Sequence, residues 1–94
     1  MSKDDPLRVL LVDDEESYLQ TTAKVFRRKG FDVDTCSAGR DVIDLLLARG
    51  CQVVVLDLKM PGMTGQEVLR SIKGRLPDVQ VIILTGHASS EDAA

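Results

Sequence analysis

Four polar residues come directly after apolar segments of this sequence, and their types can bind a metal ion and transfer or hold a phosphate. They are Asp13, Asp14, Asp57 and Thr85. The apolar segments that precede them are residues 7–12, 53–56 and 79–84. If these segments are parallel strands, their carboxyl ends share one edge of a sheet, where open α/β sheets bind ligands. The spacing therefore predicts that the three acids lie close together, with a hydroxyl nearby.

Three carboxylates within a few ångströms of one another repel, and each raises the pKa of its neighbours. A bound divalent cation offsets this repulsion. Ligands that are all oxygen atoms favour a hard ion, either Mg²⁺ or Ca²⁺. Each residue alone has an ordinary explanation: Asp13 and Asp14 as acids before a helix, Asp57 as a loop acid, Thr85 as a turn or cap residue. Because three separate segments end in a suitable group, we favour a joint site.

Segments with strand and helix periodicity alternate along the chain. The expected strands are residues 7–12, 31–36, 52–56 and 79–84, and the expected helices are residues 15–29, 39–49 and 64–74. This alternation predicts an α/β fold, a doubly wound parallel sheet with helices on both faces. On the first helix, one side is expected to gather Tyr18, Leu19, Thr22, Val25 and Phe26.

The strands differ in how their apolar residues are arranged. Residues 31–36 alternate apolar and polar, which is typical of an exposed edge, whereas the other three strands are continuously apolar. The apolar run Val81-Ile82-Ile83-Leu84 is a poor edge, because its unpaired backbone invites pairing with other chains. We therefore expect a further strand beyond it, so that the domain over residues 1–94 is C-terminally incomplete or borrows a strand from another copy.

Composition limits the classes of function. The 94 residues suit one domain, 44% hydrophobic and 29% charged, with a net charge of −3. No segment approaches the roughly 20 apolar residues of a membrane helix, and the acidic N-terminus does not resemble a signal peptide. We expect a cytoplasmic protein that does not bind nucleic acid directly. Cys36 and Cys51 are expected to be buried free thiols.

Three motifs together resemble the receiver domain of two-component response regulators, the CheY-like family of bacterial signalling proteins. The motifs are Val9-Leu10-Leu11-Val12-Asp13-Asp14-Glu15, then Val55-Leu56-Asp57-Leu58-Lys59-Met60-Pro61-Gly62-Met63-Thr64-Gly65, then Val81-Ile82-Ile83-Leu84-Thr85-Gly86-His87-Ala88. Each motif alone is weak, but their combination in this order is specific. The resemblance covers the chain from Leu7 onward.

The resemblance implies a role for each matching residue. Asp57 would accept the phosphoryl group, and Thr85 would bind it through its hydroxyl. Asp14 would bind Mg²⁺ directly, Asp13 would bind it through water, and the backbone carbonyl of Lys59 would be a further ligand beside Asp57. The family fold is a five-stranded sheet of order 2-1-3-4-5.

This chain departs from the family pattern at its end. The family has a lysine at the end of the fifth strand and an aromatic switch residue on that strand, and the sequence stops before both. We therefore expect the order 2-1-3-4 here, with the fifth strand and last helix missing. Phosphotransfer in the 94-residue form is expected to be weak or absent. The missing lysine would otherwise offset part of the negative charge of the three carboxylates and the phosphoryl group.

The function implied is a phosphorylation-dependent switch that receives its phosphoryl group on Asp57 from a sensor histidine kinase or a phosphotransfer protein. Any enzymatic activity would be at most slow autodephosphorylation. One alternative is a phosphatase with an aspartyl-phosphate intermediate, although that class separates its two acids by one residue and Asp13 and Asp14 are adjacent. Another is an interaction module that takes no phosphate and self-associates through the edge of residues 81–84.

Overall fold

The computed structural model describes residues 5–57 and 65–84. Its elements are, in chain order, β1 (Arg8–Val12), α1 (Glu16–Arg28), β2 (Asp32–Cys36), the 3₁₀ turn η1 (Gly39–Asp41), α2 (Val42–Arg49), β3 (Val53–Asp57), α3 (Gly65–Arg75) and β4 (Gln80–Leu84). The predicted alternation of strands and helices is confirmed, with boundaries that move by one or two residues. Two boundaries differ in substance: the second helix opens with a 3₁₀ turn, and Asp57 is the last residue of its strand.

The four strands form one parallel sheet of order β2-β1-β3-β4. This confirms the predicted doubly wound α/β topology and places the alternating strand β2 at an edge. Strand β1 lies between β2 and β3, so its backbone pairs with a neighbouring strand along both edges. No helix among the described residues is long and apolar enough to cross a membrane.

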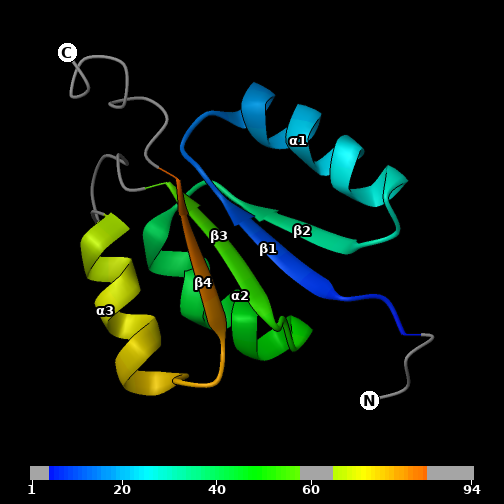
Figure 1. Cartoon of the computed structure of the whole chain (residues 1–94). Coiled ribbons are helices and arrows are strands. Elements are labelled where there is room, and N and C mark those ends of the chain that lie inside the picture. Colours follow the sequence, from blue (N-terminus) through cyan, green and yellow to red (C-terminus); the bar gives the residue numbers. More distant parts are fainter. Residues whose placement is uncertain (1–4, 58–64, 85–94) are drawn as a thin grey trace, which may run out of the picture.

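Helices cover both faces of the sheet (Figure 1). On one face, α2 and α3 pack over a core that includes Leu10, Leu56 and Ile72. On the other face, α1 packs over a smaller core that includes Leu11 and Val55. Because successive residues of β1 point to opposite faces, its continuous apolar run supplies both cores at once.

Helix α1 is rotated relative to the prediction from sequence. Its buried residues are Leu19 and Ala23, whereas Tyr18 and Val25 are each 41% exposed. At about 100° per residue, Tyr18 and Val25 lie about 100° and 120° from Leu19 around the helix axis, at the margin of the buried side. The five residues of the prediction do share one side of the helix, within an arc of about 120°. The buried side, however, is centred on Leu19 and Ala23, and Ala23 was not among them.

Helix α2 ends as predicted, at a glycine. Gly50 has a φ of 63° and its N–H donates to the carbonyl of Leu46. Residues with a side chain rarely adopt this left-handed conformation, so the glycine allows the chain to turn directly into β3. Cys36 and Cys51 are both buried and free, as expected.

Strand β4 is apolar at every position after Gln80 but is only half-buried. Among the described residues it pairs with β3 alone, and Ile82 is 51% exposed. Its sequence pattern is that of an interior strand, whereas its position within the described part of the chain is an edge.

Candidate metal centre

The strand register brings the two buried acids of the site to the same level of the sheet. Val12 of β1 lies beside Leu56 of β3 in the parallel ladder. The next residues, Asp13 and Asp57, therefore emerge side by side where the two strands end. Neither strand needs an irregular turn to achieve this, because both end at the same edge of the sheet.

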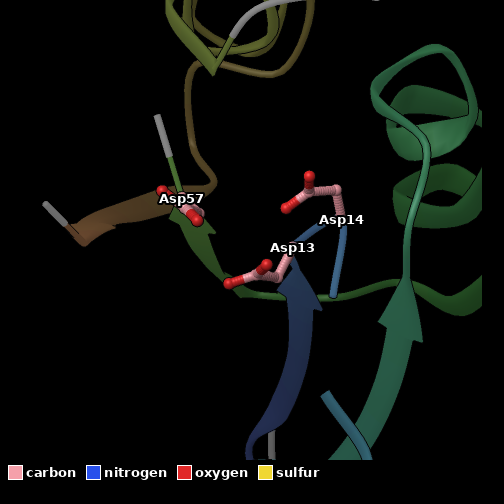
Figure 2. Close-up of side chains that lie close together, drawn as sticks. All are labelled: Asp13, Asp14 and Asp57. Atoms are coloured by element: carbon pink, nitrogen blue, oxygen red, sulfur yellow. The ribbon is translucent and has the colours of Figure 1, made fainter. Parts of the chain in front are cut away.

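Asp13, Asp14 and Asp57 form one cluster of carboxylates. Each offers an oxygen atom that lies within 4.8 Å of those of the other two. Asp13 is 2% exposed and Asp57 is 1% exposed, while Asp14 is open to solvent. Figure 2 shows the side chains of Asp13 and Asp14 extending from the end of β1 toward the space beside Asp57. The predicted convergence of these three residues is confirmed.

Two backbone groups hold Asp13 in place. Its own N–H donates to the carbonyl of Cys36 at 3.1 Å, which continues the pairing of β1 with β2 by one residue. Its carboxylate oxygen Oδ1 accepts a hydrogen bond from the N–H of Glu15 at 3.0 Å. The second contact was not predicted from the sequence, although an aspartate commonly accepts a hydrogen bond from the backbone two residues later.

The environment raises the pKa of the Asp13 carboxyl above its usual value. The largest cause is burial, and the negative charge of Asp57 adds to it, while the hydrogen bond from Glu15 acts in the opposite direction. The expectation that neighbouring acids raise the pKa is thus confirmed in direction for Asp13. Burial, however, contributes more than repulsion, because the ionised form loses its hydration inside the protein.

The cluster has the chemistry of a site for a hard divalent cation. All three groups are carboxylates, and a positive ion between them would remove the repulsion that raises the pKa of Asp13. Oxygen ligands on opposite sides of Mg²⁺ lie about 4.2 Å apart, and those on Ca²⁺ about 4.6–5.2 Å apart. The oxygen atoms of the cluster all lie within 4.8 Å of one another, which is compatible with a single ion of either kind after small side-chain adjustments. The residues therefore fit either ion.

Two predicted site residues lie outside the described residues. These are Lys59, whose carbonyl is expected to bind the ion, and Thr85, whose hydroxyl is expected to bind the phosphoryl group. Thr85 follows Leu84, which pairs with Asp57 in the ladder between β3 and β4. The described part of the chain thus ends one residue short of the expected hydroxyl.

Comparison with known proteins identifies the family. The model of the response regulator receiver domain matches residues 9–94, which is most of the chain. The chain belongs to this receiver domain family. It is 36% identical over 83 residues to the regulatory protein LuxO of Vibrio vulnificus and 34% identical over 86 residues to the cell cycle response regulator CtrA of Brucella ovis. These stretches cover 88% and 92% of the chain.

Solved receiver structures agree with this assignment. A receiver domain protein of Clostridium thermocellum is 34% identical, with a TM-score of 0.81, over 93% of this chain and 71% of that one. The response regulator TrrA of Thermotoga maritima, solved in complex with Mg²⁺ and beryllofluoride, is 28% identical with a TM-score of 0.78, over 90% of this chain and 76% of that one. TrrA has also been solved in complex with the histidine kinase ThkA, in a structure that matches this chain with 30% identity and a TM-score of 0.79 over 85% of this chain and 69% of TrrA.

The receiver domain spans only a small part of the curated relatives. It covers 18% of LuxO and 37% of CtrA. The similarity therefore concerns the receiver part of those proteins.

Proposed function

We propose that this receiver domain is a phosphorylation-dependent switch in which Asp57 accepts the phosphoryl group. The observation that supports this most directly is the position of Asp57, which ends a central strand, is 1% exposed and lies against two further carboxylates. Three carboxylates so close together repel one another, which is unfavourable for a residue that only supports the fold. A nucleophile that reacts beside a divalent cation needs this arrangement.

In the proposed step, a carboxylate oxygen of Asp57 attacks the phosphorus of a phosphohistidine. The new O–P bond forms as the P–N bond of the donor breaks, and the departing imidazole takes up a proton. The product is an acyl phosphate on Asp57. This adds about −1.5 to −2 charges and three acceptor oxygens to the end of β3.

The residues proposed to hold Mg²⁺ are Asp14 and Asp57 directly, Asp13 through water, and the backbone carbonyl of Lys59. When bound, Mg²⁺ supplies positive charge that offsets the repulsion between the carboxylates and an anionic phosphoryl donor. With the ion bound, Asp13 and Asp14 would act as its ligands, and their repulsion of Asp57 would be offset. The ion's identity as Mg²⁺ rather than Ca²⁺ rests on the family resemblance and on TrrA.

The proposed response to phosphorylation involves Thr85. Its hydroxyl would donate to an oxygen of the phosphorylated Asp57, from the end of the strand that pairs with β3. A new hydrogen bond at this place gives the segment after β4 two arrangements, whose balance depends on the phosphate.

The proposed partner is a sensor histidine kinase or a phosphotransfer protein, in the cytoplasm. TrrA offers a precedent, because it has been solved bound to a histidine kinase. On this chain, Tyr18 and Val25 of α1 both expose apolar surface; Tyr18 lies in the first turn of the helix, which follows the acidic cluster, and Val25 lies near the other end of the helix. We propose this side of α1 as the docking surface for the phosphohistidine donor.

The test is phosphate incorporation from acetyl phosphate with and without Mg²⁺. We expect slow labelling of the wild-type chain that requires Mg²⁺ and is lost in Asp57→Asn. Asp78→Asn, which changes an exposed acid in the turn after α3, is the matched control and is expected to label like the wild type. Label that persists in Asp57→Asn would contradict the assignment of the phosphoacceptor.

A second measurement does not depend on the rate of transfer. Beryllofluoride imitates a phosphoryl group on a carboxylate, so with Mg²⁺ it should raise the melting temperature of the wild type but not of Asp57→Asn. Equal melting temperatures in the wild type with and without beryllofluoride would count against the proposal.

Two other functions lead to different results in simple assays. A phosphatase would turn over a small phosphoester continuously, whereas a receiver domain would not. An interaction module would self-associate through β4, and the exposed Ile82 is the observation that favours this. Size-exclusion chromatography would then show a dimer that Ile82→Lys dissociates, and a monomer at all concentrations would contradict it.

A further inference from the structure

We propose that the backbone N–H of Glu15 positions the Asp13 carboxylate for Mg²⁺, so that ion binding is linked to the start of helix α1. This inference rests on the proposed Mg²⁺ site and assigns a role to a group that side-chain chemistry does not reveal. Glu15 donates its N–H to Oδ1 of Asp13 at 3.0 Å. One carboxylate oxygen of Asp13 is thereby engaged on the side of α1.

The position of Asp13 leaves little freedom apart from this bond. Its side chain is buried, and its backbone N–H is fixed to the carbonyl of Cys36. The carboxylate also contacts the side chains of Asp14 and Asp57, and the N–H of Glu15 is the backbone group that restricts its rotation. Without that donor, repulsion from Asp57 and Asp14 would favour a rotation away from the cluster. The bond therefore holds Asp13 in place against the repulsion between the three carboxylates.

Glu15 is suited to this role by its place at the first residue before α1. It precedes Glu16, with a φ of −95° and a ψ of 105°, and its own side chain makes no capping hydrogen bond. The first N–H groups of a helix have no partner within the helix. They also form the positive end of the helix dipole, which favours a negative group placed there. Asp13 provides this negative group from the preceding strand.

The consequence is a link between the ion and the helix. An ion that draws the Asp13 carboxylate toward Asp57 acts, through Oδ1, on the N–H that begins α1. The affinity for Mg²⁺ is therefore expected to depend on the backbone N–H of residue 15 and not on the side chain of that residue. Partners that orient a metal ligand typically change the affinity for the metal by 10–100-fold when they are removed.

The experiment compares three variants by calorimetric titration of Mg²⁺ into the 94-residue chain. Glu15→Pro removes the N–H, Glu15→Ala removes only the side chain, and Glu16→Pro places the same ring one residue later. A proline is well accepted at the first position of a helix, and the extended conformation of Glu15 already suits a following proline. We expect about tenfold weaker Mg²⁺ binding in Glu15→Pro and values within about twofold of the wild type in the other two.

Melting temperatures in EDTA separate positioning from general damage. A positioning role reduces the rise in melting temperature that Mg²⁺ produces, beyond any change seen without the ion. If Glu15→Pro does not fold in EDTA, an amide-to-ester replacement at residue 15 removes only the donor. The ester is then expected to show the same tenfold loss.

The outcomes distinguish this inference from the proposed function. Wild-type affinity in Glu15→Pro or in the ester would overturn the inference and leave the Mg²⁺ site intact. An equal loss in Glu15→Pro and Glu16→Pro would also overturn it, since the start of α1 rather than the N–H would then be responsible. A wild-type chain that binds no Mg²⁺ would overturn both proposals.

Discussion

The two ends of the sheet treat their polar groups in opposite ways. At the carboxyl end, Asp13 and Asp57 are buried beside each other, and the exposed Asp14 adds a third carboxylate to the cluster. At the amino end, the polar groups are exposed and complementary. Arg8 and Gln52 exchange hydrogen bonds of 2.9 Å, since the N–H of each residue donates to an oxygen of the other.

Charges of both signs also alternate at the amino end. Arg8 and Asp32 line a hollow of about 340 Å³ there, and Arg49 lies 3.7 Å from Asp34. Polar groups that pair with each other and with water stabilise a fold modestly, whereas buried like charges destabilise it until a ligand arrives. This difference supports the proposal that the carboxyl end of the sheet binds an ion, whereas the polar groups at the amino end contribute to the fold.

The largest expected difference between the two ends is in ion binding. Asp14→Ala removes a proposed direct ligand and should weaken Mg²⁺ binding about 100-fold, at or above the upper end of the losses found for groups that only support a ligand. Asp32→Ala removes an equally exposed acid from the amino end and should leave the affinity unchanged. Calorimetric titration of both variants is the measurement. An Asp14→Ala affinity within twofold of the wild type would remove Asp14 from the ligand set.

A smaller effect of opposite sign is expected on stability without the ion. Asp13→Asn removes a buried charge but keeps an oxygen that can accept the N–H of Glu15. In EDTA at neutral pH, we expect the free energy of unfolding to rise by about 1 kcal/mol, as found when destabilised functional sites are relaxed. Urea unfolding measures it. A variant that is less stable than the wild type would show that the charge of Asp13 is already compensated.

The pH dependence tests the cause of that gain. The folded chain raises the pKa of Asp13 above 3.8 and so binds this proton more tightly than the unfolded chain. The contribution of Asp13 to stability is present below the unfolded pKa and is lost as the pH rises through the folded pKa. The stability gap between Asp13→Asn and the wild type should therefore widen as the pH rises from about 4. A gap that is equal at every pH would point to packing instead.

The convergence of the acids at the carboxyl end of the sheet could be predicted from the sequence, whereas the buried side of α1 and the backbone contact of Asp13 could not. The apolar runs before Asp13 and Asp57 sufficed to place both acids at one edge, because parallel strands leave no other arrangement. The orientation of α1 was not predicted, since the buried Ala23 carries a weaker hydrophobic signal than the exposed Tyr18. The N–H of Glu15 was also missed, because a backbone donor is present at every residue except proline and becomes informative only through geometry.

The smallest expected effect lies at the amino end, in the ion pair between Arg49 and Asp34. The Nε of Arg49 and Oδ1 of Asp34 are 3.7 Å apart, and their side chains are 60% and 31% exposed. Water and salt screen such a pair, so a double-mutant cycle with Arg49→Ala and Asp34→Ala should give about 0.3 kcal/mol at low salt. The value should fall toward zero as salt is added. A coupling energy above about 1 kcal/mol that does not fall with salt would show that the charges at this end are also shielded from water. The two ends would then differ in whether neighbouring charges are alike or opposite, and not in how deeply they are buried.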